Sequence, residues 1–213
     1  MMIQFLTTLI LALIIFVPAC YITSNLFFRT SEQAKDNYVD FVKELTNFAE
    51  KEQIGARKSI MLIMDEATAI VYFEKDGPEV LVNVDAAFPS IDYTINLQKP
   101  GQCDDTKNCL CLFRSSKFEA EGTELTVIPE RVVCSNLDYN LEVETCSMGV
   151  PSEVNSYICS NGFMIERQLA KNIPAEILEV HSYYELPRRT ALYFIKFGDS
   201  VKLIGDYGGQ EKQ

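Results

Sequence analysis

The sequence has a single histidine, His181, and its cysteines never occur as Cys-x-x-Cys pairs. It also lacks the Gly-x-Ser-x-Gly, His-Glu-x-x-His, Walker and dinucleotide-binding patterns. The lone histidine and the missing cysteine pairs argue against a zinc site, because the usual ligand spacing is absent. His181 has no neighbouring cysteine or second histidine, so we assign it no catalytic role. The sequence therefore predicts no enzymatic activity, no cofactor and no metal.

Charged side chains are absent from the start of the chain, and the first one is Arg29. Eleven of the residues from Ile3 to Val17 are Leu, Ile, Val or Phe. An uncharged apolar run of roughly 20 residues is long enough for a helix to cross a bilayer. We therefore predict a transmembrane helix in residues 1–22, and we assign residues 1–28 to a membrane anchor.

Two other fates of this segment stay open. It can be a cleaved signal peptide, because Val17-Pro18-Ala19 places small residues where signal peptidase cleaves, or a lipoprotein signal with Cys20 lipidated. A basic region before the apolar run is missing, which favours a retained anchor. Arg29 and Lys35 after the run favour a cytosolic C-terminal domain under the positive-inside rule. The cysteines favour the opposite side, and we give them more weight.

Seven cysteines are present, and an even set of six lies outside the apolar segment. These six are Cys103, Cys109, Cys111, Cys134, Cys146 and Cys159. Such a cluster is typical of disulfides formed in an oxidising compartment, so we predict three disulfides in a domain outside the cytosol. Six buried free thiols are the alternative, since cysteine also behaves as a small hydrophobic residue.

Acidic residues dominate the part of the chain after residue 58. Residues 59–213 hold 13 basic and 24 acidic side chains, and they account for the whole net charge of −11. This charge repels phosphate backbones and anionic lipid headgroups, so nucleic acid is excluded as a partner. Asp104–Asn108 crowds oxygen ligands that suit Ca²⁺, but Lys107 within it and the missing EF-hand glycine favour an ordinary polar loop.

Residues 29–55 predict an amphipathic helix. Thr30-Ser31-Glu32-Gln33 has the form of a capping box, and Gly55 is suited to the C-cap. Apolar residues recur with helical spacing at Ala34, Tyr38, Phe41, Leu45 and Phe48. We expect this stripe to pack on the chain's own sheet rather than on another subunit, because five positions are too few for a coiled coil.

Residues 56–207 predict an antiparallel β domain, and residues 208–213 a flexible tail. Short apolar, β-branched-rich runs alternate with turn residues throughout this region. Pro129 interrupts one run, which suggests an edge or a bulge. A turn centred between Gly122 and Thr123 would place Cys111 opposite Cys134 and allow a cross-strand disulfide. The predicted class is α+β: a transmembrane helix and an amphipathic helix, followed by an antiparallel β-rich, sandwich-like domain.

The apolar start, the Val17–Tyr21 step (Val-Pro-Ala-Cys-Tyr) and the helical continuation over residues 1–54 resemble type IV pilin-like subunits. The chain departs from them, because no basic-plus-glycine processing site precedes the helix and no acidic residue lies near its start. The Cys-Leu-Cys-Leu run and the acidic β domain also resemble uncharacterised membrane-anchored surface proteins of archaea. This second resemblance implies no activity for any residue.

Together these patterns predict a membrane-anchored, extracytoplasmic surface or assembly protein with a structural or interaction role. Such a protein would be a pilin-like subunit or an envelope component, and its partners would be the membrane, through residues 1–28, and other protein subunits. An anchored ligand-binding or sensory ectodomain is the alternative, and it would need a concave apolar pocket in the β domain. An anchored hydrolase is a more distant alternative.

Overall fold

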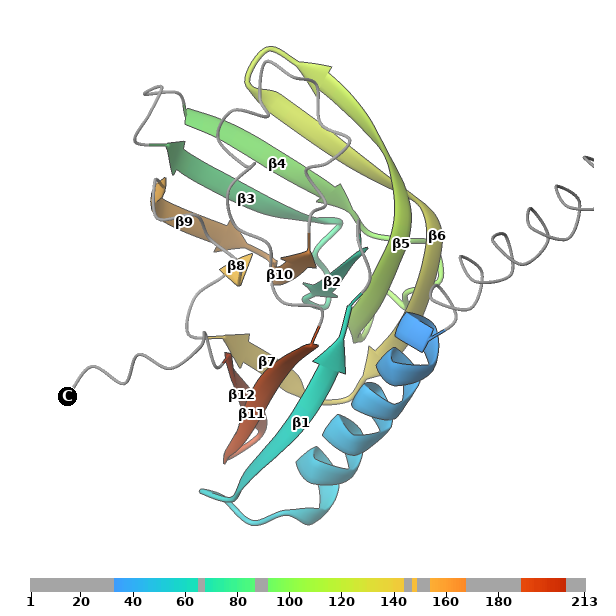
Figure 1. Cartoon of the computed structure of the whole chain (residues 1–213), viewed down its shortest axis with the longest axis vertical. Coiled ribbons are helices and arrows are strands. Elements are labelled where there is room, and N and C mark those ends of the chain that lie inside the picture. Colours follow the sequence, from blue (N-terminus) through green and yellow to red (C-terminus); the bar gives the residue numbers. More distant parts are fainter. Residues whose placement is uncertain are drawn as a thin grey trace, which may run out of the picture.

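A computed structural model describes residues 33–64, 68–86, 92–143, 147–148, 154–167 and 189–205. Within these ranges the chain forms one helix, over residues 33–51, and twelve strands arranged in two sheets (Figure 1). The smaller sheet has the order β1-β11-β12-β7 and the larger one β8-β10-β2-β5-β6-β4-β3-β9. The small sheet and the helix lie below the large sheet in the view of Figure 1.

Three strands of the small sheet are the first and the last two strands of the described chain, and the fourth, β7, comes from its middle. They are β1 (Arg57–Ile63), β11 (Arg189–Phe197), β12 (Ser200–Gly205) and β7 (Asn140–Val143). Those of the large sheet are β2 (Thr68–Phe73), β3 (Glu79–Ala86), β4 (Asp92–Gln98), β5 (Asn108–Glu121), β6 (Glu124–Leu137), β8 (Ser147–Met148), β9 (Val154–Ser160) and β10 (Gly162–Arg167). The large sheet curls until β3 approaches β2 and β10, which gives it a nearly closed, barrel-like shape.

The α+β prediction is therefore wrong: the described chain is mostly β, with a single helix against two sheets. Within the described ranges, no helix combines the length and the apolar character that crossing a bilayer requires. The predicted membrane helix of residues 1–22 lies outside the described residues. The sheets are also mixed rather than purely antiparallel, because β4 pairs with β6, β7 with β12, and β8 with β10 in parallel.

The helix packs along its apolar stripe. All five stripe residues, from Ala34 to Phe48, are buried, and four of them join the first core cluster. The rings of Phe41 and Phe48 each lie 5.7 Å from that of Phe194 on β11. The stripe thus contacts the chain's own sheet, as helical spacing and burial of one face require. It is not available as a seam for a neighbouring subunit.

The strands β2, β5 and β10 separate two core clusters. Ile70, Tyr72 and Leu110 point toward the helix and the small sheet, whereas Val71 and Cys111 point into the curled large sheet. Every residue of β2 is buried, because both of its faces are covered. The inside of the large sheet is consequently filled by side chains.

The strand β1 is an edge of the small sheet, and the helix covers part of that edge. The side-chain amide of Asn37 donates from Nδ2 to the carbonyl oxygen of Met61 at 3.2 Å, and its Oδ1 accepts from the backbone N–H of Ile63 at 2.6 Å. Asn37 therefore pairs with this part of β1 in the way that a further strand would. The carboxylate of Glu44 also forms an ion pair with Lys58 of β1, and this hydrogen bond holds the pKa of Glu44 below its ordinary value.

The β5–β6 hairpin sets the register of the cysteines. Cys111 lies opposite Cys134, as a turn centred between Gly122 and Thr123 predicts. The ladder shifts twice between this pair and the turn, near Ser115 and opposite Pro129, and the two shifts cancel. The bulge expected at Pro129 is confirmed, because proline cannot donate to a ladder.

Candidate functional site

Four of the six candidate cysteines meet where β4 leads into β5. Cys103, in the connecting loop, forms a disulfide with Cys109 at the start of β5, with their Cα atoms 5.7 Å apart. Cys111 forms a disulfide with Cys134 across the β5–β6 hairpin, with a Cα separation of 4.1 Å. This short separation is typical of pairs that are not directly hydrogen-bonded, in which side chains lie closest. The loop is thereby fixed to the large sheet twice.

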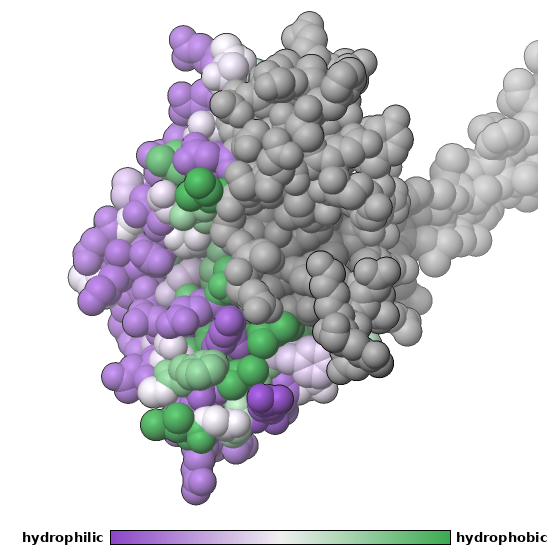
Figure 2. Space-filling view, turned by 90° about the vertical axis from the view of Figure 1, so that its left-hand side faces the viewer, coloured by the Kyte–Doolittle hydropathy of each residue, from purple (hydrophilic) through white to green (hydrophobic). Residues whose placement is uncertain are grey.

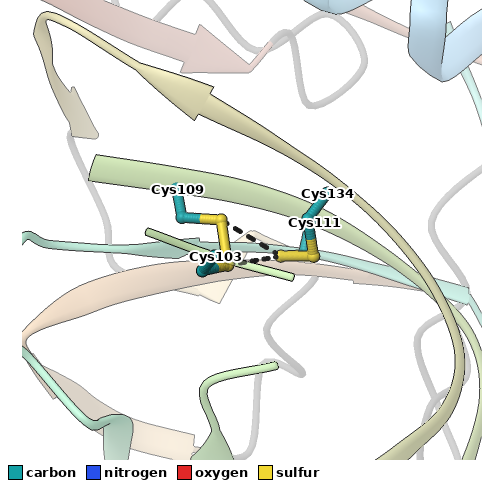
Figure 3. Close-up of side chains that lie close together, drawn as sticks. All are labelled: Cys103, Cys109, Cys111 and Cys134. Carbon is teal, nitrogen blue, oxygen red and sulfur yellow. Dashed lines mark hydrogen bonds between the residues drawn. A yellow bond between two sulfur atoms is a disulfide. The ribbon is translucent and has the colours of Figure 1, made fainter. Parts of the chain in front are cut away.

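The two disulfides touch one another (Figure 3). The Sγ atom of Cys111 lies 3.4 Å from Sγ of Cys103 and 3.6 Å from Sγ of Cys109. All four sulfur atoms lie within 4.8 Å of one another. Cys109 and Cys111 are fully buried, whereas Cys103 and Cys134 are partly exposed. We call these four residues the sulfur cluster.

Reduced thiols in this arrangement would form a four-cysteine donor set of the kind that binds zinc tetrahedrally. The spacing argument against zinc could not show this, because it counts only cysteines that are close in sequence. In the disulfide form, however, the sulfurs are bonded to each other and are not thiolates. The structure therefore contains disulfides here rather than a metal centre.

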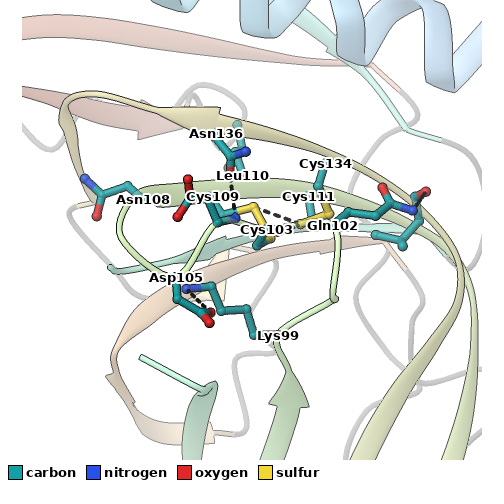
Figure 4. Close-up of a disulfide and its surroundings, with 12 residues drawn as sticks. Lys99, Gln102, Cys103, Asp105, Asn108, Cys109, Leu110, Cys111, Cys134 and Asn136 are labelled. Atoms are coloured by element: carbon teal, nitrogen blue, oxygen red, sulfur yellow. Dashed lines mark hydrogen bonds and ion pairs between the residues drawn. A yellow bond between two sulfur atoms is a disulfide. The ribbon is translucent and has the colours of Figure 1, made fainter. Parts of the chain in front are cut away.

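A buried lysine accompanies the sulfur cluster (Figure 4). The side chain of Lys99 is only 5% exposed, and its Nζ has no hydrogen-bond acceptor among the described residues. The nearest counter-charge is Oδ1 of Asp105, at 3.7 Å, on a side chain that is 93% exposed. A buried ammonium without a hydrogen bond is costly. Sequence reasoning missed this residue, because the Lys-Pro-Gly turn has the usual composition of an exposed loop.

The acidic loop satisfies its own polar groups. Oδ1 of Asp104 accepts hydrogen bonds from the hydroxyl of Thr106 at 2.7 Å and from its backbone N–H at 2.9 Å. These bonds hold the pKa of Asp104 below its ordinary value, the hydroxyl having the larger effect. Lys107 pairs with Asp138 at 2.9 Å, which raises the pKa of Lys107. The loop is thus explained by internal contacts, without a calcium ion.

The buried amide of Asn108 completes the connection between loop and sheet. Its Oδ1 accepts from the backbone N–H of Lys75 at 3.0 Å. Its Nδ2 donates to the carbonyl oxygen of Tyr139 and to Oδ1 of Asn140, both at 2.9 Å. One side chain therefore ties the turn after β2, the start of β5 and the start of β7 together.

A polar cavity of about 290 Å³ lies at the C-terminal end of the helix. Its lining includes Thr46, Glu50, Tyr139, Lys196 and Asp199. The ammonium of Lys196 donates to a helix carbonyl, and burial raises the pKa of Tyr139 to about 12. This cavity differs from the apolar pocket that a ligand-binding ectodomain would need.

Apolar side chains are exposed on the face of the small sheet that points away from the helix. Met61 is 48% exposed, Tyr193 42% and Phe197 52%, and Ile195 and Ile204 lie beside them, partly buried. We call these five residues the outer face. Figure 2 shows apolar residues gathered in the lower part of one side of the molecule, among hydrophilic ones.

Several predicted site residues lie outside the described residues: His181, Cys20 and Cys146. Cys159 of β9 is disulfide-bonded and packs against the core inside the large sheet.

The chain matches no protein-family model, and neither a curated protein nor a solved structure matches it.

Proposed function

We propose that the chain is an extracytoplasmic interaction protein that is attached to the membrane through residues 1–28 and binds other protein subunits through its outer face. The disulfides support an extracytoplasmic location, because such bonds persist mainly in oxidising environments. The observation that carries the interaction role is the exposure of Met61, Tyr193 and Phe197 on neighbouring strands. Contiguous exposed apolar residues rimmed by polar ones commonly mark protein contacts.

The partner that fits this surface is apolar at its centre and opposite in net charge to the chain. The chain carries a net charge of −11, and complementary charge favours partners of the opposite sign. On the outer face itself, Arg57 and Lys202 lie opposite Ile195, and Asp199 is exposed in the turn after Phe197. A second copy would bring the same negative charge and is disfavoured by repulsion. We therefore propose a component of a larger envelope assembly rather than a homopolymer.

This proposal places the contact on a different element from the one that the pilin-like resemblance implies. In such an arrangement the helical stripe would face a neighbour, but Tyr38, Phe41 and Phe48 are covered by the chain's own sheets. The ligand-binding alternative receives less support, because the inside of the large sheet is filled by core side chains such as Val71, Phe73 and Phe113.

Site-specific photo-crosslinking in the native cell tests the docking surface. A photoreactive residue replaces Tyr193 or Phe197, and matched controls replace Val39 or Ile158, which are 50% and 62% exposed elsewhere. We expect one heteromeric adduct from the outer-face positions and none from the controls. Equal adducts at all four positions, no adducts, or an adduct of twice the chain mass would contradict the proposal.

Intact-mass spectrometry after rapid alkylation in cells tests the compartment separately. We expect Cys103, Cys109, Cys111 and Cys134 to escape alkylation because they are disulfide-bonded, and we expect the protein in the membrane fraction. Full alkylation of these four residues would place the domain in a reducing compartment. This result would leave the docking surface to be judged by crosslinking alone.

A further inference from the structure

We infer that the sulfur cluster is a thiol–disulfide exchange site, in which an external dithiol attacks Cys134 and Cys111 transfers its bond to Cys103. The inference goes beyond the docking role and does not involve the outer face. It follows from three observations: contact between the two disulfides, unequal burial of their cysteines, and a buried lysine in their surroundings.

Access decides which sulfur of the Cys111–Cys134 disulfide is attacked. Cys134 is partly exposed and Cys111 is fully buried, so an external thiolate meets the Cys134 side of their disulfide first. Its sulfur forms a bond to Sγ of Cys134, and the Cys111–Cys134 bond breaks. Cys111 leaves as a thiolate with the electron pair of the broken bond. The second thiol of the reductant then releases Cys134 as a thiol and closes its own disulfide.

Contact decides where the Cys111 thiolate reacts next. Sγ of Cys103 lies 3.4 Å away and Sγ of Cys109 3.6 Å away, so the Cys111 sulfur faces the side of the Cys103–Cys109 bond. Once released from Cys134, the Cys111 side chain has to rotate to bring its sulfur in line with this bond for attack on Cys103. A new bond forms between Cys111 and Cys103, and the Cys103–Cys109 bond breaks. Cys109 becomes a thiolate and takes up a proton. In total, two electrons pass from the dithiol to the protein, which ends with a Cys103–Cys111 disulfide and thiols at Cys109 and Cys134.

Lys99 is a positioning residue for this exchange. Its side chain is buried in the surroundings of the Cys103–Cys109 disulfide, its ammonium is directed to Asp105, and it lacks a hydrogen-bond acceptor among the described residues (Figure 4). A nearby cation stabilises the thiolate relative to the thiol, and thiolates are the species that attack and leave in exchange. The transient anion on Cys111 or Cys109 would supply the counter-charge that exposed Asp105 only partly provides.

Partial reduction of the full-length wild-type protein tests the inference. Substoichiometric dithiothreitol is added, the reaction is quenched with acid, free thiols are alkylated, and bridged peptides are mapped by fragmentation that separates Cys109 from Cys111. We expect a Cys103–Cys111 bridge with alkylated Cys109 and Cys134. A protein with alkylated Cys111 and Cys134 and an intact Cys103–Cys109 bridge would overturn the inference.

Two matched variants isolate the transfer step without a reductant. Cys134→Ser leaves Cys111 as a thiol beside the remaining bridge, and we expect a mixture of Cys103–Cys109 and Cys103–Cys111. Cys111→Ser leaves Cys134 as a thiol instead, and we expect Cys103–Cys109 alone. A single Cys103–Cys109 bridge in Cys134→Ser would contradict the transfer. Where this variant fails to fold, the wild-type experiment decides.

The role of Lys99 has its own readout. Lys99→Met should shift the pH profile of the exchange rate to higher pH and slow the exchange at pH 7 by about tenfold, the effect of one pKa unit from a nearby charge. Lys99→Arg should restore the rate, because it keeps the charge. A purely structural role of Lys99 would leave the pH profile of the exchange rate unchanged. An unchanged profile in Lys99→Met would therefore remove Lys99 from the mechanism.

Discussion

The phenolic hydroxyl of Tyr38 donates a hydrogen bond to the carbonyl oxygen of Leu110 at 2.6 Å, and it thereby joins the helix to β5 at the centre of the large sheet. The tyrosine side chain is only 1% exposed, and this burial raises the pKa of its hydroxyl. The helix is thus held by a polar contact that fixes its position along the sheet, as well as by its apolar stripe.

Tyr38→Phe should lower the free energy of unfolding by about 1–2 kcal/mol, because it leaves buried hydrogen-bonding groups without their partner. Denaturant unfolding followed by circular dichroism measures the change. Lys43→Ala, on the exposed side of the same helix, serves as the control and should stay within about 0.5 kcal/mol of the wild type. A loss of the same size in both variants would contradict the role of the hydroxyl.

Phe194→Ala should destabilise the protein by about 3–5 kcal/mol, because it opens a cavity where the rings of Phe41 and Phe48 meet β11. Phe197→Ala is the matched control, since it removes the same atoms from the same strand on the exposed face. Chemical denaturation should show little change for this control. If both substitutions cost the same, the assignment of the two faces of β11 is wrong.

Gly162→Ala should disrupt the pairing of β10 with β2. Gly162 has a φ of 144°, and an added Cβ would lie 1.9 Å from the carbonyl oxygen of Tyr72. The backbone would have to move, so we expect a loss of more than about 2 kcal/mol, measured as a lower thermal midpoint. Gly101→Ala is the control, because nothing lies within 4 Å of its added Cβ. Equal midpoints in the two variants would refute this expectation.

Alkaline pH should unfold the domain. Burial raises the pKa of Tyr72 and Tyr139 to about 12, above the value of 10.0 for the free side chain. The folded state holds these protons more tightly, so its stability is complete below pH 10 and falls as the pH approaches 12. Each tyrosine contributes a slope of up to about 1.4 kcal/mol per pH unit.

Tyrosinate absorbance and circular dichroism, recorded together during an alkaline titration, measure this loss. Tyr139→Phe should reduce the slope, because one raised pKa is removed. Exposed Tyr193 supplies the control, since Tyr193→Phe should leave the slope unchanged. Ionisation of all tyrosines near pH 10 without unfolding would show that the phenols are not buried.

Local patterns predicted the individual elements well. Helical spacing identified the buried stripe from Ala34 to Phe48, and short β-branched-rich runs identified the strand-forming part of the chain after residue 56. Symmetric counting about the turn at Gly122 predicted the pairing of Cys111 with Cys134. The count succeeds because the residue that β5 gains near Ser115 is matched by one that β6 gains near Pro129.

The arrangement of these elements was beyond local patterns. The parallel pairing of β4 with β6 and of β7 with β12 joins segments separated by other strands, and no short-range signal encodes it. The class assignment failed because it counted two helices, one of which lies outside the described residues, whereas the described chain packs one helix against two sheets of twelve strands. The burial of Lys99 depends on how β4 and β5 meet in space, so composition could not reveal it.

The amide of Asn37 occupies a carbonyl and an N–H at the edge of β1 that another polypeptide would need in order to lengthen the sheet. Other copies of the protein therefore cannot pair with this end of the edge strand to extend the sheet. Because a helix side chain provides this protection, partial unfolding of the helix would expose the unpaired backbone groups of Met61 and Ile63. The helix turn that carries Asn37 thus protects this end of the β1 edge.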